Sequence, residues 1–325
     1  MLSVRTAGAL TTAAAGALAV AAAVALAGSG PTATAPRAMW QELRPATVAR
    51  TEVAAARVGA FAYVLGGYVP PSGATTAIVE RYDLRRNRWR RVRPLPVALN
   101  HAAAASDGRF LYVVGGYTAG LGGETRALRR YDPRTDRWTR LPDMPTARGA
   151  LGAAITGGRL YAVGGARRGG EALRTLEIFD LRSRRWRTGP PMPTAREHLA
   201  VAAREGAVYA FSGRTAQAGN VSAVERLQGG RWERLPPIQH ARGGIAATAV
   251  GPELVVLGGE EAAGTIRSVE AYAPARRRWR YLAAMPRPRH GLGAVTYRGR
   301  VFAFSGGPQP GLTYAADAEA LRVAR

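Results

Sequence analysis

One spacing, repeated along most of the chain, limits the possible folds more than any other feature. Successive tryptophans are 46 to 49 residues apart, at Trp40, Trp89, Trp138, Trp186, Trp232 and Trp279. A small residue followed by glycine ends an apolar run with the same period, at Gly66-Gly67, Gly115-Gly116, Gly164-Gly165, Ser212-Gly213, Gly258-Gly259 and Ser305-Gly306. Two independent markers with one period indicate a single structural unit repeated along the chain.

Each unit is predicted to contain four short strands. In the third unit they are a small apolar strand over Gly149–Thr156, a second over Leu160–Val163, a third over Glu177–Asp180, and a fourth around Trp186. A turn ending in proline, such as Met192-Pro193, closes the unit. The 40 glycines and 21 prolines of the chain favour many short strands joined by turns, and they disfavour a helical bundle.

This set of markers resembles the kelch repeat over residues 39–325. The glycine pair, an aromatic-Asp pair such as Tyr82-Asp83, and the tryptophan keep fixed offsets. The resemblance implies an all-β, six-bladed kelch β-propeller, in which each blade buries its faces against its neighbours. The sixth unit lacks a tryptophan, whereas Trp40 precedes the first complete unit. We therefore expect the N-terminal strand to complete the last blade and close the ring.

The first residues are predicted to direct export. Arg5 is followed by an apolar run from Ala7 to Ala27 and by Gly28, which is the pattern of a secretory signal peptide. We predict a signal peptide over residues 1–28, a linker over 29–38, and a secreted or extracytoplasmic mature protein without a membrane span. The alternatives are an uncleaved membrane anchor over residues 7–27, since about 20 residues cross a bilayer, and an Ala-rich tail without a role.

Composition excludes several kinds of chemistry. The absence of cysteine excludes disulfides, thiolate zinc sites and iron–sulfur clusters. All 46 basic residues are arginine, against 22 acidic residues, and the formal net charge is +24. Arginine without lysine is typical of a GC-rich genome, so this charge reflects codon usage as well as binding partners. No nucleic-acid-binding module is recognisable, and we expect a monomer that needs no cofactor.

Polar residues gather around one position of the repeat. The residue 16 positions before each small-Gly pair is Leu99 in the second unit and arginine in the others, at Arg50, Arg148, Arg196, Arg242 and Arg289. Within two residues of this position lie the four histidines and three further polar residues, namely His101, His198, His240, His290, Glu52, Asn100 and Glu197. Because the first strand of a propeller blade lines the central channel, we expect these side chains around one mouth of the channel.

The candidate ligand-binding residues are Arg50, Arg148, Arg196, Arg242, Arg289, Asn100, His101, Glu197, His198 and His290. Guanidinium groups bind carboxylates and phosphates, so the predicted ligand is an anionic small molecule, a glycan or an acidic protein segment. The kelch resemblance also implies ligand binding on this face. The alternative is that the arginines form hydrogen bonds between blades. We predict no metal site, because the spacing of the units does not by itself bring three histidines to one ion.

Two further sets of charged residues repeat with the unit. Arginines flank the tryptophan strands, at Arg88, Arg90, Arg91, Arg137, Arg140, Arg185, Arg187, Arg231, Arg234, Arg277, Arg278 and Arg280. They either protect the outer edge of each blade from aggregation or bind an anionic polymer. A glutamate recurs in the third strand, with Arg129 in its place in the second unit, at Glu80, Glu177, Glu225, Glu270 and Glu319. We expect it to pair with arginine, and we expect function to lie in residues unique to one unit.

The favoured function is that of a non-enzymatic binding module, because no nucleophile–base constellation is recognisable. Exported kelch rings also resemble sialic-acid mutarotases, which implies as an alternative a cofactor-independent sugar-acid mutarotase or epimerase, with Glu197 or His198 as acid or base. Copper radical oxidases, a related class, need a Tyr–Cys crosslink, which a chain without cysteine cannot form. The predicted export signal opposes an intracellular adaptor role like that of kelch ubiquitin-ligase subunits.

Overall fold

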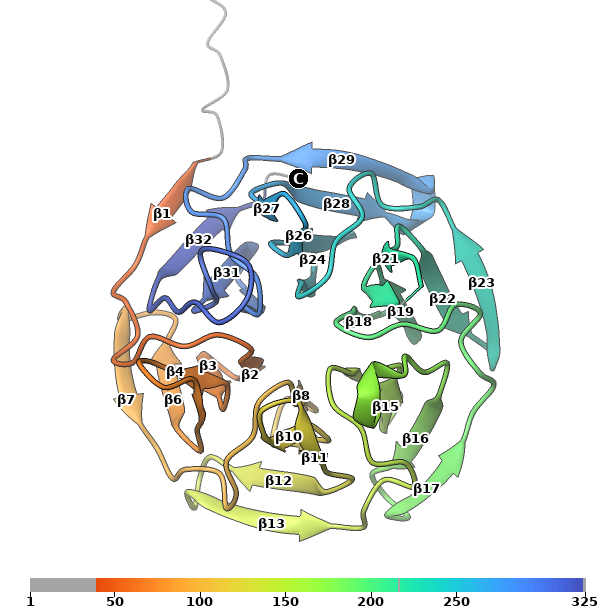
Figure 1. Ribbon diagram of the computed structural model, residues 1–325, viewed down its shortest axis with the longest axis horizontal. Helices are drawn as coiled ribbons and strands as arrows, with labels where there is room; N and C mark the ends of the chain where they lie inside the picture. The colour runs from red at the N-terminus through yellow and green to blue at the C-terminus, as the bar shows by residue number, and fades with distance from the viewer. Residues whose placement is uncertain (1–38, 216, 324–325) are drawn as a thin grey trace, which may run out of the picture. The chain divides into compact units, whose positions relative to one another are not determined.

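Six four-stranded antiparallel sheets form the blades of a ring in the computed structural model, which describes residues 39–215 and 217–323 (Figure 1). The predicted all-β six-bladed propeller is confirmed. In the described residues no helix has the length and apolar character that crossing a membrane requires. The predicted signal peptide and linker lie outside the described residues.

The blades are numbered along the chain. Blade 1 consists of β2 (Ala54–Val58), β3 (Phe61–Leu65), β6 (Val79–Asp83) and β7 (Arg88–Arg91). Blade 2 consists of β8 (Ala103–Ser106), β9 (Leu111–Val114), β12 (Leu128–Asp132) and β13 (Arg137–Leu141). Blade 3 consists of β14 (Gly152–Thr156), β15 (Arg159–Val163), β16 (Leu176–Asp180) and β17 (Arg185–Thr188). Blade 4 consists of β18 (Ala200–Arg204), β19 (Ala207–Phe211), β22 (Val224–Gln228) and β23 (Arg231–Leu235). Blade 5 consists of β24 (Ala246–Val250), β25 (Glu253–Leu257), β28 (Val269–Ala273) and β29 (Arg278–Leu282). Blade 6 consists of β30 (Gly293–Tyr297), β31 (Arg300–Phe304), β32 (Ala318–Arg322) and β1 (Trp40–Glu42).

Small hairpins and turns connect the second and third strands of several blades. The hairpins are β4 (Tyr68–Val69) with β5 (Ala74–Thr75), β10 (Tyr117–Ala119) with β11 (Gly122–Glu124), β20 (Arg214–Thr215) with β21 (Gly219–Asn220), and β26 (Glu260–Glu261) with β27 (Gly264–Thr265). The 3₁₀ turn η1 (Arg168–Gly170) takes this place in blade 3, and a second 3₁₀ turn, η2 (Pro274–Arg276), precedes β29.

The N-terminal strand closes the ring as predicted. Strand β1 pairs antiparallel with β32, with Trp40 opposite Leu321. The indole N–H of Trp40 donates to the carbonyl of Ala283 in blade 5 (2.8 Å), and that of Trp89 in blade 1 donates to Arg44 after β1 (2.7 Å). The first residues of the propeller are thus held on both sides by blades from opposite ends of the chain.

The core lies between neighbouring blades, because each sheet is apolar on both faces. Between blades 1 and 2, Tyr63 and Leu65 pack with Leu111 and Val113. Across the junction of blades 6 and 1, Phe302 packs in a cluster that also contains residues of blade 1. Burial of these faces requires a neighbour on each side, so each blade depends on the packing of the next.

The first strand of blade 3 begins at Gly152, later than the predicted Gly149. Gly149 instead forms an isolated bridge with Ala166, and Ala150 has a φ of 51°, a left-handed conformation that interrupts the strand. A residue with positive φ occurs at this place in all six blades, at Glu52, His101, Ala150, His198, Gly244 and Gly291. These six residues, called the central belt below, surround the candidate site.

Candidate binding site at the centre of the ring

Backbone hydrogen bonds join the central belt from blade to blade. His101 N–H donates to the carbonyl of Glu52 (3.2 Å), and His198 N–H donates to that of Ala150 (2.9 Å). The belt closes between the last and first blades, where Val53 N–H donates to Gly291 (3.1 Å). All six belt residues line a narrow cavity of about 100 Å³. The belt therefore brings one residue from each blade to the centre of the ring.

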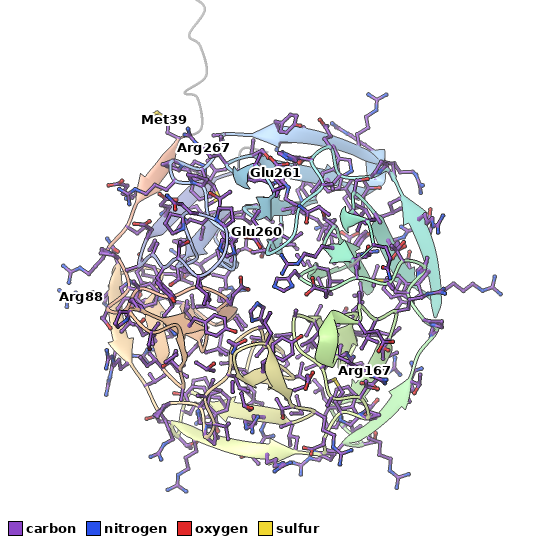
Figure 2. All side chains as sticks on the ribbon, in the orientation of Figure 1. Met39, Arg88, Arg167, Glu260, Glu261 and Arg267 are labelled. Carbon is purple, nitrogen blue, oxygen red and sulfur yellow. The ribbon has the colours of Figure 1, made fainter. Side chains whose placement is uncertain are left out.

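A second level of residues lies next to the belt. The residue before each belt residue forms a backbone bridge with the residue after the small-Gly pair, as in the pairs Asn100–Tyr117, Glu197–Arg214 and Gly243–Glu260. Residues of the belt and of this level line a larger cavity of about 470 Å³. Figure 2 shows Glu260 inside the ring and Arg88 at its perimeter. Since blade 3 has only Gly149, Ala150 and Ala166 at these positions, the polar groups come from the other blades.

Arg214 joins two carboxylates on one side of the larger cavity. Its Nε lies 2.6 Å from Glu197 Oε1 and its Nη1 lies 2.9 Å from Glu260 Oε1, while Nη2 lies 3.1 Å from His198 Nε2. Burial raises the pKa of Glu197, but the hydrogen bond from His198 and the charge of Arg214 lower it more, so the net shift of this pKa is downward. Glu197 is therefore ionised at neutral pH.

Glu52 joins two histidines on the other side. Its Oε2 lies 3.2 Å from His101 Nε2, and its Oε1 lies 3.1 Å from His290 Nδ1. Burial alone raises the pKa of Glu52, but its histidine partners lower it well below the ordinary value. Burial lowers the pKa of His101 to about 4, whereas Glu52 and Glu260 raise the pKa of His290 against the effect of burial. At neutral pH, Glu52 is thus an anion held between two histidines.

The five repeated arginines do not line this cavity, so the expectation that they point into the channel mouth is wrong. They are fully buried, and each forms an ion pair with the third-strand glutamate of its own blade, in the pairs Arg50–Glu80, Arg148–Glu177, Arg196–Glu225, Arg242–Glu270 and Arg289–Glu319. Arg196 also donates through Nη2 to the carbonyl of Ala210 (3.1 Å). The arginines bind inside the blades because buried glutamates and free strand carbonyls offer partners there. The predicted structural role of the glutamates is confirmed.

The other candidates lie at the centre. Asn100, His101, Glu197, His198 and His290 all belong to the belt or to the level next to it. His240 does not, because its half-exposed side chain lies against Glu261, 3.1 Å from Nε2 to Oε2. The prediction from sequence missed Arg214, Glu260 and Tyr68. These residues directly follow the small-Gly pair, and this fixed offset was the available signal.

Three residues of the belt also lie close enough to hold a metal ion. Glu52, His101 and His198 each offer one ligand atom, and these atoms lie within 4.8 Å of one another. No metal site was predicted, since the spacing of the repeats gives no direction for the side chains. Ring closure brings the side chains from blades 1, 2 and 4 together.

The arginines that flank the tryptophans lie on the outermost strands, as predicted. In β7 and β17 the arginines are exposed while the tryptophan between them is half-buried. This arrangement covers the apolar outer edge of the blade with charge. These strands are far from the central cavity in Figure 2, where Arg88 points outward.

Comparison with known proteins agrees with this architecture. A family model described as the KLHDC2/KLHL20/DRC7 Kelch-repeats domain matches residues 52–259, and one described as the Kelch motif matches residues 241–286. The chain is 30% identical over 90 residues to beta-scruin of Limulus polyphemus and 42% identical over 78 residues to Kelch-like protein 34 of Homo sapiens. These alignments cover 27% and 23% of this chain, and 10% and 12% of the two relatives.

Among solved structures, the fold is similar to that of YjhT. The TM-score is 0.71 at 15% sequence identity, and the superposition covers 85% of this chain and 95% of the YjhT chain. At this identity the similarity shows the fold alone. Since the first kelch model matches more than half of the chain, the protein belongs to the kelch-repeat family.

Proposed function

We propose that this chain is a non-enzymatic binding module that receives a protein segment in the cavity of about 470 Å³ at the centre of the ring. The observation that carries the proposal is the division of charged residues. Those that repeat in nearly every blade form buried pairs, whereas those that occur in only one or two blades, such as His101, Arg214 and Glu260, line the cavity. Convergent polar groups with shifted pKa values in one cavity are typical of a binding site.

The cavity has an apolar wall and a polar floor. Leu121 and Leu312 line it, yet their side chains are 64% and 58% exposed, which is unusual for large apolar residues. The rest of the lining, called the floor below, carries the polar residues Glu52, Tyr68, His101, His198, Arg214, Glu260 and His290. A segment with an apolar side chain beside a polar one would cover the leucines and reach this floor.

The charges of the floor favour a neutral or cationic side chain over an anionic one. Among the lining residues, the carboxylates of Glu52 and Glu260 outnumber the single arginine, Arg214, whose guanidinium is already paired with Glu197 and Glu260. The predicted anionic ligand loses its main support, because the five buried arginines already have glutamate partners. We therefore expect lysine or serine in the central position of the bound segment.

A set of peptides that differ only in the central residue tests this proposal. Leu-Leu-X-Leu-Leu peptides with X as Lys, Ser or Glu would be titrated into EDTA-treated protein by calorimetry. We expect the Lys and Ser peptides to bind at least about 10-fold more tightly than the Glu peptide, which corresponds to ~1.4 kcal/mol. Leu121→Ser with Leu312→Ser should weaken binding. Tyr281→Ser is the control, because Tyr281 is an exposed apolar residue of β29 outside the cavity. Equal weakening by both changes contradicts the proposal.

A sugar-acid mutarotase remains the second candidate. Glu197 contacts His198 and Arg214, which line the cavity, so a proton-transferring carboxylate lies next to a guanidinium that suits a sugar carboxylate. The probe is the α anomer of N-acetylneuraminic acid, followed by NMR. Acceleration of its conversion that Glu197→Gln removes supports this candidate, and conversion at the spontaneous rate rejects it.

We also propose export, on the basis of the apolar run that follows Arg5. Mass spectrometry of the protein from its producing cell should find a mature N-terminus near Gly28. An intact Met1 in a soluble cytosolic fraction contradicts export.

A further inference from the structure

The central belt carries three large polar side chains where the backbone suits glycine. Glu52, His101 and His198 have φ values of 53°, 49° and 51°, and blades 5 and 6 have Gly244 and Gly291 at the same place. A left-handed conformation is unfavourable for residues with a Cβ atom. Because Ala150 shares this conformation, with a φ of 51°, the backbone is a property of the repeat, and the three polar side chains that three blades place here need an explanation of their own.

The protonation of His101 follows from its neighbour Asn100. The Asn100 amide donates through Nδ2 to Thr75 Oγ1 (2.8 Å) and to the carbonyl of Gly120 (3.0 Å), and a carbonyl can only accept. Asn100 Oδ1 must then face His101 Nδ1, 2.6 Å away, so Nδ1 carries the proton. Nε2 is then the nitrogen of His101 that can coordinate a metal ion, and it lies on the side of the ring that faces Glu52.

His101 Nε2 faces a carboxylate. It lies 3.2 Å from Glu52 Oε2, and because Nδ1 already carries a proton, either a second proton on the ring or a metal ion links the two atoms. A proton would serve two atoms only, whereas a metal ion also engages a third ligand.

His198 supplies the third ligand with the same kind of orientation. Its Nδ1 faces Glu197 Oε2, so Nδ1 carries the proton and Nε2 the electron pair. The rings of His101 and His198 are 4.7 Å apart and nearly perpendicular, which excludes a stacked pair. A histidine that donates one N–H to an amide or carboxylate oxygen while the other nitrogen faces an electron acceptor is the usual form of a metal ligand.

We propose that Glu52, His101 and His198 bind one divalent transition-metal ion of the zinc type, with each histidine coordinating through Nε2. Two imidazoles and one carboxylate are ligands that zinc accepts. Ligand atoms at 2.0–2.2 Å from zinc lie ~3.3 Å apart, so side-chain movements of about 1 Å close a cluster whose atoms are within 4.8 Å. Asn100 and Glu197 are positioning residues.

Arg214 competes for one of these ligands. Its Nη2 lies 3.1 Å from His198 Nε2, so this hydrogen bond must open before the metal binds. The guanidinium keeps its bonds to Glu197 and Glu260 when it moves away from the ring nitrogen. Since Glu52, His101 and His198 all line the larger cavity, the remaining coordination position faces it and can hold water.

Metal titration of the full chain tests this site independently of peptide binding. EDTA-treated protein would be titrated with Zn²⁺ alone by calorimetry, and with Co²⁺ by visible absorption and paramagnetic NMR. We expect one ion per chain, micromolar or tighter affinity, and two shifted imidazole N–H signals with Co²⁺. His101→Gln should remove one signal and lower the affinity at least 10-fold, and Asn100→Leu should lower it 10- to 100-fold. His240→Gln is the matched control, and it should change neither the number of shifted imidazole signals nor the affinity for the metal ion.

Folding of each variant would be checked by thermal melting, and Glu52→Gln replaces His101→Gln if that variant does not fold. Failure to take up one ion at 100 µM Zn²⁺ overturns the proposal, and shows that Glu52 and His101 share a proton instead. An equal loss of affinity in His240→Gln also overturns it. Peptide binding is measured in EDTA, so either result leaves the proposed function to its own test.

Discussion

Arg196 Nη1 lies 2.8 Å from Glu225 Oε2, and both side chains are fully buried in blade 4. Four other blades contain the same pair, but blade 2 has Leu99 and Arg129 in place of the arginine and the glutamate. Arg129 lies directly opposite Arg140 in the adjacent strand, and its buried Nη1 has no hydrogen-bond partner among the described residues. The repeat therefore contains five buried arginine–glutamate pairs and one buried arginine, Arg129, without a glutamate at the paired position.

Removal of one member of a buried arginine–glutamate pair should strongly destabilise the protein. Arg196→Leu leaves the Glu225 carboxylate buried without its partner, and we expect a loss of about 3–5 kcal/mol in the free energy of unfolding. Urea denaturation measures this loss. Arg187→Leu on β17 changes the charge equally at an exposed position, and it should shift stability by less than ~0.5 kcal/mol. Similar losses in both variants would show that overall charge, and not pairing, is responsible.

Replacement of Arg129 should instead increase the free energy of unfolding. Burial and the charge of Arg140 lower the pKa of Arg129, which means that its charged form is disfavoured in the fold. Arg129→Leu removes this disfavoured charge from the fold. We expect the melting temperature to rise, with a gain of about 1 kcal/mol. A fall comparable to that of Arg196→Leu would mean that Arg129 has a stabilising partner.

Ring closure should depend on Trp40. Its half-buried indole packs against the cluster between blades 5 and 6 and donates to Ala283. Trp40→Ala should lower the free energy of unfolding by roughly 2–4 kcal/mol, somewhat less than a fully buried tryptophan. Thermal unfolding measures the effect. Met39→Ala is the control, since Met39 is 79% exposed. If both variants melt like the unmodified protein, β1 does not hold the ring closed.

The second residue of the small-Gly pair should tolerate no side chain. Gly259 has a φ of 109°, and an added Cβ would lie 2.5 Å from Ile245 Cγ2 and 2.8 Å from the carbonyl of Gly243. We expect Gly259→Ala to cost more than ~3 kcal/mol, or to prevent folding. Gly158 also has positive φ but has open space around it, so Gly158→Ala should cost only about 1–2 kcal/mol. Chemical denaturation of the two variants compares crowding with conformational strain, and equal costs would exclude crowding.

Asp136 should give the stability of the ring an acid-dependent component. Burial raises its pKa, but the hydrogen bonds that the Tyr131 hydroxyl and the N–H of Arg93 in blade 1 donate to the carboxylate, together with nearby arginine charges, lower the pKa more. A lowered carboxyl pKa adds stability above the ordinary value of about 4, and this stability is lost as the pH falls through the lowered value. Asn87 makes the equivalent bonds without charge, so Asp136→Asn should fold.

The measurement is urea denaturation of the unmodified protein and of Asp136→Asn between pH 2 and pH 7. The difference in their free energies of unfolding should be largest above pH 5 and shrink toward pH 2. A difference that stays constant across this range would show that the charge of Asp136 contributes nothing.

The period of the tryptophans and glycine pairs was sufficient to predict the blades and the closing strand, because every unit needs the same backbone at the same place. Gly259 shows the reason. Its positive φ and its close approach to Ile245 and Gly243 admit no residue other than glycine, so the backbone requirement appears directly in the sequence. The uniqueness of Asn100, His101, Glu197, His198 and His290 within the repeat also predicted much of the central site. These features depend on local backbone conformation or on the period of the repeat, so they can be recognised in the order of the residues alone.

Only the tertiary structure decides in which direction a side chain points and which residues of distant blades come together. Arg196 and His198 are two residues apart, yet one turns into its own blade toward Glu225 while the other reaches the centre. The left-handed belt sets that difference, and a buried glutamate 29 residues away provides the partner. Likewise, Glu52, His101 and His198 become neighbours only when the ring closes, because contacts between blades depend on packing in three dimensions and not on the order of residues within one repeat.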